Sequence, residues 1–409
     1  MTYFDHSATT PVDKDILKTM LPYFSGNFGN ASSIHQYGQK AMEGVEYGRQ
    51  IAAKYFNCQP DEIVFTGGAT EANNLAIRGL IAAIKRSSQH ITPHVITSVI
   101  EHDSVLEPFA QLEREGTAVT HIPVDSKGVI IFEKLEAAIK DNTVLISIMY
   151  VNSEVGSIQP IRQIGKLVRK INEQRQKKWE QTIPADRTAK PYRLYFHTDA
   201  TQAINFLPSD VKEFNLDMLS MSAHKIYGPK GVGLLVIKQG TPLTALQLGG
   251  HHENNRRSGT LNVPGIVGLG KALENLTNEN IAKQNKKIAV LRNRLVKGVK
   301  KLVPNVTLNT DIKNATPGHA HFSFHGIEGE SILISLDLAG VAVSTGSACA
   351  SNSLKASHVL IAMGIPVEIA HSSIRFTLGK HNKKSDVDHL LTVLPDIISR
   401  LRNMAPKLD

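Results

Sequence analysis

Short apolar runs alternate with helical patterns from Asp61 to Ile237, and this alternation limits the possible folds more than any other feature of the chain. The run TVLISIMYV at 143–151 is apolar at most positions, as is typical of a strand covered on both faces. Strand–helix–strand alternation predicts a mainly parallel sheet with helices on both faces. We expect strands at 63–66, 94–100, 117–124, 143–151, 193–200, 217–224 and 231–237, and helices at 70–85, 104–115 and 161–174.

The pattern changes after Pro264, where a long basic helix is followed by short strands and two further helices. This order predicts a smaller α+β unit. The helices are expected at 281–302, 331–338 and 386–403. We therefore expect a large domain at 15–262 and a small domain made of 1–14 and 263–409.

The stretch from Asn172 to Tyr192 is polar and basic and holds the only tryptophan, Trp179. It lies between an expected helix and an expected strand, where a connection usually has ~2–6 residues. We therefore expect an inserted loop on the surface.

Composition excludes several classes of protein. Hydrophobic residues make up 41% and charged residues 20% of the chain, so a buried core is expected and disorder as the main state is excluded. No run of apolar residues is long enough for a spanning helix, and no signal peptide is expected at the start. Two cysteines, Cys58 and Cys349, are too few for a disulfide framework or a thiolate metal site, and they fit a cytoplasmic location.

The net charge is +9, with the basic residues spread along the chain. Such a charge can attract nucleic acid or phosphate-bearing ligands. Because the basic residues are dispersed, a solvated surface is the simpler interpretation, and direct binding of nucleic acid is not expected.

Lys225 follows an expected buried strand and precedes the glycine-rich turn YGPKGVG. A desolvated lysine at a strand exit has a lowered pKa and can act as a nucleophile toward an aldehyde cofactor. Asp199 stands at another strand end, where a carboxylate can hold a pyridinium nitrogen protonated, and Gln202 follows three residues later. Taken alone, Asp199 is better interpreted as the N-cap of a helix.

The segment Thr66-Gly67-Gly68-Ala69-Thr70 lies between a strand and a helix, as in phosphate-binding turns. An ordinary turn capped by Thr70 is the alternative. Ser222, His224 and the distant Thr260 are further candidate phosphate ligands.

His102 and Asn152 follow two more expected strands. A neutral imidazole can stack on a flat ring and carry protons near pH 7. Asn152 can bind a ring oxygen or a substrate carboxylate. Taken alone, His102 fits an ordinary histidine at a strand end.

Cys349 lies in STGSACAS, whose small polar residues predict an exposed loop and an accessible thiol. Downstream, Arg375 in SSIRFTLG can bind a carboxylate through two parallel hydrogen bonds. Cys58 lies at an expected helix end and is interpreted as structural.

Five strand ends thus each present a polar group suited to the same cofactor, and the chain resembles the class V aminotransferases. Within them it is similar to the NifS/IscS-type cysteine desulfurases, nearly end to end. The motifs that carry the resemblance are YFDHSATTP, NFGNASSIH, FTGGATEANNLA, EHDSV, VNSEVGSIQPI, HTDATQ, SAHKIYGPKGVG, RRSGTLNVPGIVG, STGSACASNS and SSIRFTLG.

The resemblance implies a fold type I pyridoxal-phosphate enzyme. Its large α/β domain would hold a mainly parallel seven-stranded sheet, and a smaller α+β domain would carry the cysteine loop. The implied protein is a cytoplasmic homodimer that uses pyridoxal 5'-phosphate and converts L-cysteine to L-alanine. The sulfur would pass as a persulfide to an acceptor protein for iron–sulfur cluster assembly or for thiolation of tRNA or a cofactor.

The resemblance also implies a role for each candidate residue. Lys225 would form the Schiff base, Asp199 would pair with the ring nitrogen, and His102 would stack on the ring. Gln202 and Asn152 would bind the ring oxygen, and Arg375 with Asn152 would bind the substrate carboxylate. Cys349 would take the sulfur and is a candidate transient ligand of an iron–sulfur cluster; no other metal site is expected. The phosphate would be held by Ala69, Thr70, Ser222, His224 and, from the partner subunit, Thr260.

The chain departs from the common pattern of this family at several places. Ala31 stands where proline is frequent, and Asn254 and Asn255 replace a basic residue and a glycine. The ending NMAPKLD lacks the tail with which some relatives bind an iron–sulfur scaffold. The acceptor is therefore open between a scaffold, a tRNA-thiolation protein and a thiamine-pathway carrier.

Two alternatives to a cysteine desulfurase are a selenocysteine lyase or aminotransferase of the same class, and a non-catalytic sulfur-transfer or nucleic-acid-binding protein.

Overall fold

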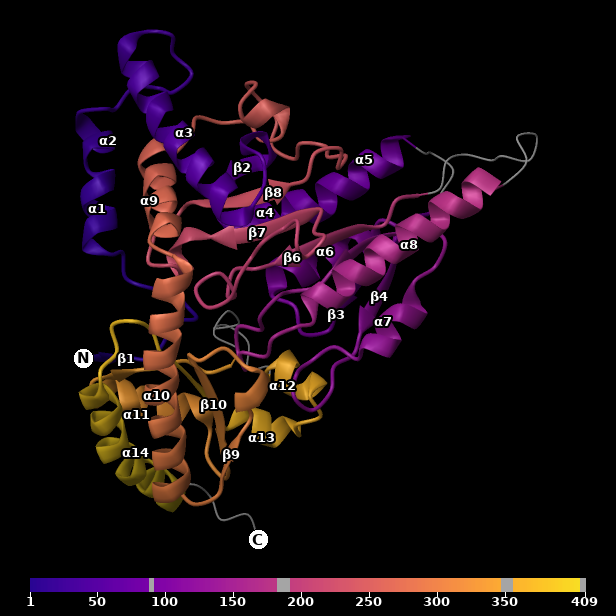
Figure 1. The fold of residues 1–409 in the computed structure, drawn as a ribbon. Helices are drawn as coiled ribbons and strands as arrows, with labels where there is room; N and C mark the ends of the chain where they lie inside the picture. The colour runs from indigo at the N-terminus through magenta and orange to yellow at the C-terminus, as the bar shows by residue number, and fades with distance from the viewer. Residues whose placement is uncertain (88–91, 182–191, 347–355, 405–409) are drawn as a thin grey trace.

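The computed structural model describes residues 1–87, 92–181, 192–346 and 356–404, and its largest element is a sheet of seven strands (Figure 1). These strands are β2 (Ile63–Thr66), β3 (His94–Ser98), β4 (Ala118–Ile122), β5 (Thr143–Ser147), β6 (Tyr195–Asp199), β7 (Met218–Ser222) and β8 (Gly233–Ile237). Their order is β2-β8-β7-β6-β5-β3-β4, and β8 alone runs opposite to the other six strands. The predicted mainly parallel seven-stranded sheet is confirmed.

Helices cover both faces of this sheet, and alternate strand residues contribute to two separate cores. Phe65 and Ile96 face one core, and Val64 and Val95 face the other. The first core is covered by α3 (Gln36–Phe56), α7 (Phe132–Ala138), α8 (Ile161–Gln181) and α9 (Val263–Glu274). The second is covered by α6 (Asp103–Arg114) and by α4 (Ala69–Asn74), which continues through a π-helical turn (η2, Leu75–Gly79) into α5 (Leu80–Ser87). The sheet and these helices are called the large unit below.

A smaller unit has its own sheet and its own core (Figure 1). The antiparallel sheet has the order β12-β10-β9, and a parallel pair, β1 with β11, lies beside it. The core includes Phe4, which places the beginning of the chain in this unit. The strands are β1 (Thr2–Tyr3), β9 (Val306–Leu308), β10 (His319–Phe324), β11 (Val341–Ala342) and β12 (Ser373–Thr377). The helices are α10 (Asn278–Leu302), α11 (Gly329–Leu338) and α14 (Lys384–Met404).

Four short helices connect or flank the two units. α1 (Lys14–Met20) and α2 (Pro22–Ser25) lie beside α9, and α12 (His358–Ala362) and α13 (Val367–His371) contribute Leu360 and Ala370 to the first core. The domain limits at residues 14 and 262 stay a prediction.

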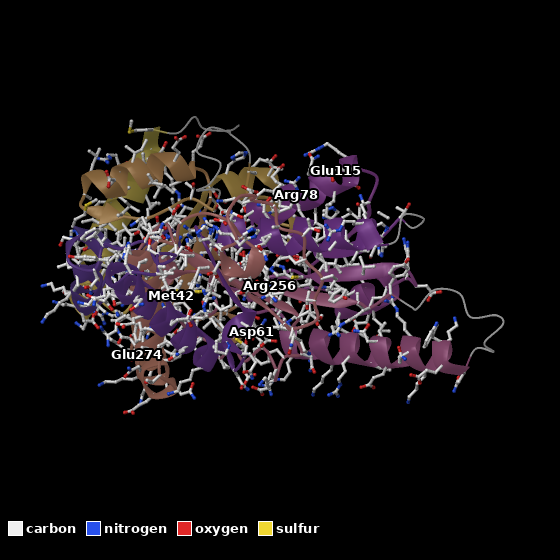
Figure 2. The ribbon with its side chains drawn as sticks, turned by 90° about the horizontal axis from the view of Figure 1, so that it is seen from above. Met42, Asp61, Arg78, Glu115, Arg256 and Glu274 are labelled. Carbon is white, nitrogen blue, oxygen red and sulfur yellow. The ribbon has the colours of Figure 1, made fainter. Side chains whose placement is uncertain are left out.

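The predicted helix end at 174 and the loop predicted from 172 onward are wrong, because α8 continues to Gln181. The residues after Gln174 contain neither glycine nor proline before Pro184, so nothing in them ends a helix. Arg175 also ties the extension to the body by donating to the carbonyl oxygens of Lys140, Thr143 and Tyr192. Figure 1 shows α8 extending beyond the sheet edge, and Figure 2 shows the same from above. The rest of the predicted insertion, 182–191, lies outside the described residues.

Candidate active site

The carboxyl ends of the parallel strands β3, β5, β6 and β7 meet at one edge of the large sheet. Asp199 is the last residue of β6, and His102, Asn152 and Lys225 closely follow β3, β5 and β7, so the structure brings these four predicted residues to a single edge. Ligands of open α/β sheets bind at such edges.

Lys225 ends a short 3-10 turn, η4 (Ala223–Lys225), directly after β7. Its amine donates to the carbonyl oxygens of Ser7 and Ala8, the latter at 2.6 Å. The N-terminal segment therefore lies across the lysine and forms one wall of the site.

Asp199 and His102 are joined by a chain of buried hydrogen bonds. Asn73 Nδ2 lies 2.8 Å from Asp199 Oδ2 and 2.9 Å from Ser104 Oγ, to both of which it donates. Ser104 Oγ in turn lies 2.9 Å from His102 Nδ1, and the backbone N–H of Ser104 donates to the same nitrogen at 3.0 Å. Because Nδ1 accepts this bond, the proton of the neutral ring is on Nε2.

The simple interpretation of His102 as a histidine at a strand end is correct, and this residue is also the N-cap of α6. The N-cap interpretation of Asp199 is wrong, because turns and not a helix follow it; its Oδ1 accepts from the backbone N–H of Thr201 at 2.9 Å. The two donors to Asp199 fix its carboxylate, which is 7% exposed.

Gln202 contacts the same wall as Lys225. Its Nε2 donates to Ser7 O at 2.9 Å, and Ser7 Oγ donates to its Oε1 at 3.2 Å. Ser7 Oγ also lies 2.9 Å from Nε2 of buried His319, so the small unit supports Gln202 through Ser7.

The predicted phosphate ligands gather around the start of α4. The first-turn N–H groups of Ala69 and Thr70 have no acceptor within their helix. Gly68 has φ +153, and a Cβ atom there would approach Ser222 Oγ to 3.7 Å, so Ser222 lies beside the turn. His224 Nδ1 lies 3.1 Å from Thr9 Oγ1, and burial next to Lys225 lowers the pKa of His224 to about 4, so that its ring is neutral at pH 7.

Thr260 is exposed in the loop that precedes α9. This loop is held near α4 by the ion pair of Arg257 Nε with Glu71 Oε1 at 2.8 Å. It is also fixed by Arg256, which donates to Asp61 O at 2.7 Å (Figure 2).

Asn152 and Arg375 lie close together at the boundary of the two units. Asn152 is 1% exposed, and its side chain binds backbone groups: Oδ1 accepts from Glu154 N, and Nδ2 donates to Ile100 O at 3.1 Å. Arg375 Nη1 donates to Ser153 O at 3.1 Å, and Arg375 Nη2 pairs with Asp5 Oδ1 at 2.9 Å. The buried Nε of Arg375 has no acceptor among the described residues.

Two buried glutamates beside the site were not predicted. Burial raises the pKa of Glu101 to about 8 and that of Glu154 to about 7. Glu101 accepts from Ser98 Oγ at 2.6 Å and from Met149 N at 2.9 Å, while Glu154 accepts from Ser357 Oγ at 2.5 Å. For Glu101 the available signal was an acid shortly after a strand of buried residues, since β3 ends at Ser98; Glu154 lies farther beyond the end of β5, at Ser147, and no local pattern marks it.

Cys349 lies outside the described residues. The other cysteine, Cys58, is half-buried, and burial raises the pKa of its thiol to about 12, which fits the predicted structural role.

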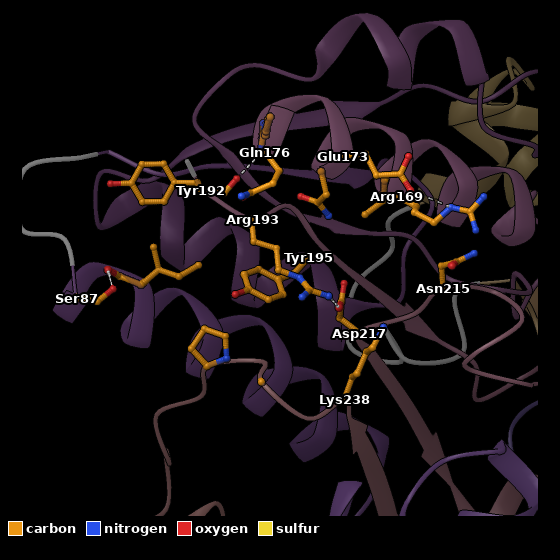
Figure 3. A pocket seen from close by; sticks show the side chains of 16 residues that line it. Ser87, Arg169, Glu173, Gln176, Tyr192, Arg193, Tyr195, Asn215, Asp217 and Lys238 are labelled. Atoms are coloured by element: carbon orange, nitrogen blue, oxygen red, sulfur yellow. Dashed lines mark hydrogen bonds and ion pairs between the residues drawn. The ribbon is translucent and has the colours of Figure 1, made fainter. Parts of the chain in front are cut away.

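A cavity of about 650 Å³ lies at the opposite edge of the sheet, next to the second half of α8 (Figure 3). It is lined by residues at the amino ends of β6 and β7, such as Arg193 and Asp217, which form an ion pair at 2.6 Å. The predicted catalytic residues stand at the other ends of these strands, so this cavity is separate from the site.

The residues present fit pyridoxal phosphate by the chemistry of their groups. An amine, a fixed carboxylate and an imidazole suit the aldehyde, the ring nitrogen and the ring face. The N–H groups at the start of α4 suit the phosphate, because a helix N-terminus carries partial positive charge. Among the described residues, no cluster of His, Cys, Asp and Glu side chains is arranged to hold a metal ion, and no helix is long and apolar enough to cross a membrane.

Comparison with known proteins identifies the family. The model of the class V aminotransferases matches residues 2–174 and 182–390. The chain belongs to the class V aminotransferase family. The interruption at 175–181 coincides with the unpredicted part of α8.

Relatives extend over almost the whole chain. The chain is 45% identical to "Cysteine desulfurase IscS" of Clostridium botulinum over 406 residues, 99% of this chain and 96% of the relative. It is also 45% identical to the protein of the same name from Methanosarcina thermophila, over 99% of this chain and 93% of the relative. A solved "NIFS-LIKE PROTEIN" superimposes with a TM-score of 0.86 at 35% identity, covering 98% of this chain and 100% of the other. These similarities confirm the predicted family and fold type.

Proposed function

We propose that this protein is a pyridoxal-phosphate-dependent cysteine desulfurase that converts L-cysteine to L-alanine and receives the sulfur on Cys349. The observation that carries the proposal is the gathering of Lys225, Asp199 and His102 at one sheet edge beside the start of α4. The names of the full-length relatives agree with this activity, and a neighbour solved as "SspA in complex with cysteine" (TM-score 0.78, 34% identity, 94% of this chain and 100% of the other) supports the substrate.

The proposed reaction balances without an external oxidant or reductant. The C–S bond of L-cysteine breaks, an S–S bond forms at Cys349, and a thiol plus cysteine give a persulfide plus alanine. When bound, pyridoxal phosphate supplies an electron sink for the bonds at the substrate Cα.

The residues of the chain then bind and orient the cofactor and the substrate, and they move protons. Asp199, which accepts hydrogen bonds from Asn73 and Thr201, is assigned to pair with the ring nitrogen. His102 carries its proton on Nε2 and is assigned as the residue that stacks on the ring and moves protons. Arg375, which now pairs with Asp5, is assigned to the substrate carboxylate because a guanidinium can bind a carboxylate through two donors.

The proposed enzyme acts as a homodimer in the cytoplasm, with Thr260 reaching the phosphate of the partner subunit. Large hydrophobic side chains around α1 and α2 are exposed in the single chain, as expected of a surface that a second copy covers. They are Leu17, Leu21, Phe24, Phe28, Ile34 and Tyr37.

Iron–sulfur cluster assembly is the proposed destination of the sulfur. Thiolation of tRNA or of a cofactor is the alternative. These two destinations are distinguished by loading the enzyme with isotopically labelled sulfur and adding cell extract. The label then appears on either a cluster scaffold or a thiolation protein.

Mass spectrometry after mixing with L-cysteine tests the activity itself. We expect one added sulfur atom on Cys349 and release of alanine. Cys349→Ala is expected to lose sulfur release from L-cysteine under reducing conditions. Full release by this variant, or a transamination product in place of alanine, would favour another class V enzyme.

A further inference from the structure

The residues on either side of 347–355 meet at one buried side chain, Glu154. A Cβ atom on Gly346 would lie 2.6 Å from Glu154 Oε2 and 3.3 Å from Ser357 Cβ. Gly346 and Ser357 are thus almost in contact, and both touch the Glu154 carboxyl group. The segment that carries Cys349 therefore begins and ends at the same point of the molecule.

Ser357 is bound to Glu154 by a short hydrogen bond. Its hydroxyl donates to Glu154 Oε2 at 2.5 Å and accepts from Leu360 N at 3.2 Å, as the N-cap of α12. Val359 and Leu360 pack into the core of the large unit. The end of the segment is therefore fixed through both a polar and an apolar contact.

Gly346 occupies a space in which no side chain fits. Besides Glu154, a Cβ atom there would approach His321 Nε2 to 3.2 Å. His321 Nδ1 lies 3.0 Å from the Asn309 side-chain amide, which donates to it, so the ring proton is on Nε2. This buried N–H has no acceptor among the described residues.

The neighbouring residues tie both ends to the substrate side of the site. Ser344 pairs with Arg375 through two backbone hydrogen bonds, of 2.7 and 3.4 Å. His358 Nε2 lies 3.0 Å from Glu101 O, directly before His102. The carboxyl group of Glu154 thus lies among contacts that join the residues flanking 347–355 to the sheet edge where the candidate catalytic residues gather.

Glu154 has no ion-pair partner among the described residues; the charges that act on its carboxyl group are those of Arg375, Asp103 and His102, and the ring of His321 lies near the same Cβ position of Gly346. Burial raises its pKa to about 7. Glu154 consequently holds its neighbours through a hydrogen bond and through the space its side chain fills. A neutral amide of equal size can reproduce both.

We propose that Glu154 is a positioning residue that fastens Gly346 and Ser357 together and thereby sets the point from which Cys349 reaches the substrate. The proposal rests on the proposed function, since it requires Cys349 to receive the sulfur. Three peptide units join Gly346 to Cys349, and these span at most ~11 Å between Cα atoms. A shift of Gly346 therefore changes directly which atoms the thiol can reach.

The test separates substrate binding from sulfur transfer. In the cofactor-loaded enzyme, binding of L-alanine, which has no sulfur, is followed by the cofactor's absorption spectrum. Appearance of sulfur on Cys349 after a rapid mix with L-cysteine is followed by mass spectrometry. For Glu154→Ala and Ser357→Ala we expect L-alanine affinity within twofold of the parent and sulfur transfer at least tenfold slower.

The variants are matched so that each outcome either supports or contradicts the positioning role of Glu154. Glu154→Gln should restore the parent rate within threefold, and the double variant should be no slower than the slower single one, because both remove the same contact. Ser372→Ala, a buried serine that bonds Ile369 O at 2.8 Å, should behave like the parent.

Unchanged sulfur transfer in Glu154→Ala, or parallel loss of L-alanine binding, would overturn the positioning role. Absence of sulfur on Cys349 in the parent enzyme would instead contradict the proposed function.

Discussion

At the scale of single residues, Glu101 illustrates how burial makes a side chain sensitive to pH. It is 0% exposed, and its two donors, Ser98 Oγ and the Met149 N–H shared between both oxygens, do not offset the loss of water around its carboxyl group. Its pKa rises from 4.5 to about 8, so near neutral pH the folded protein retains a proton that the unfolded chain has released.

Glu101→Gln is therefore expected to change how stability depends on pH. In the parent, the contribution of Glu101 to the free energy of unfolding falls as pH rises from about 4.5 to about 8, because the folded state binds more protons in this range. The variant should lose this slope and gain up to a few kcal/mol relative to the parent at pH 8. Urea unfolding at pH 5 and pH 8 measures this change in the pH dependence of the free energy of unfolding. Equal slopes in both proteins would contradict the raised pKa of Glu101.

The sequence predicted the catalytic candidates but not the residues that hold them. Lys225, Asp199 and His102 were found because each follows a recognisable strand. Ser7 and Glu154 were missed, since their partners Gln202 and Ser357 are 195 and 203 positions away along the chain. Contacts at such separations are created by the fold and leave no local pattern.

At the scale of elements, the crossing of α3 and α9 depends on glycine. A Cβ atom on Gly48 would lie 2.7 Å from Ile266 Cγ2, and one on Gly270 would lie 2.8 Å from Gly48 Cα. The glycines of α3 also explain why the extent of this helix of 21 residues was not predicted and only its end near Cys58 was expected, because glycine lowers helix propensity. The same residues that weaken the local helical pattern are required by the close packing.

Gly48→Ala is expected to lower the free energy of unfolding by about 1–3 kcal/mol, the usual cost of overpacking a core. Gly26→Ala is the control, because Gly26 has φ −80 and a Cβ atom there would meet only Pro22 O, at 3.4 Å. It should stay within about 0.5 kcal/mol of the parent. Equal free energies of unfolding of the two variants in urea would show that α3 and α9 can move apart without loss of stability.

At the scale of the whole molecule, the site lies between two units, and the small unit is built from two separate stretches of the sequence. Residues before α1 join the small unit, and the wall of Ser7 and Ala8 lies over Lys225 of the large unit. Local patterns predicted most of the strands but not the order β2-β8-β7-β6-β5-β3-β4, since pairing between distant strands is a property of the complete fold.

The exposed hydrophobic surface around α2 leads to a prediction about assembly. Phe24 and Phe28 are 61% and 63% exposed, and a charge at both positions should prevent a second copy from packing there. Phe24→Asp with Phe28→Asp is expected to convert the proposed dimer to a monomer in light scattering after gel filtration, and to weaken cofactor retention at least tenfold. Leu338→Asp, at an 84% exposed position of the small unit, should remain dimeric. A double variant that stays dimeric would place the interface elsewhere.

The central claim is that Lys225 holds the cofactor covalently. Borohydride reduction of the purified protein, followed by peptide mass spectrometry, tests it most directly. We predict that the reduced pyridoxal phosphate is attached to the peptide containing Lys225 and to no other, and that Lys225→Ala incorporates none. Attachment at a different lysine such as Lys230, or no attachment in the parent, would contradict the account.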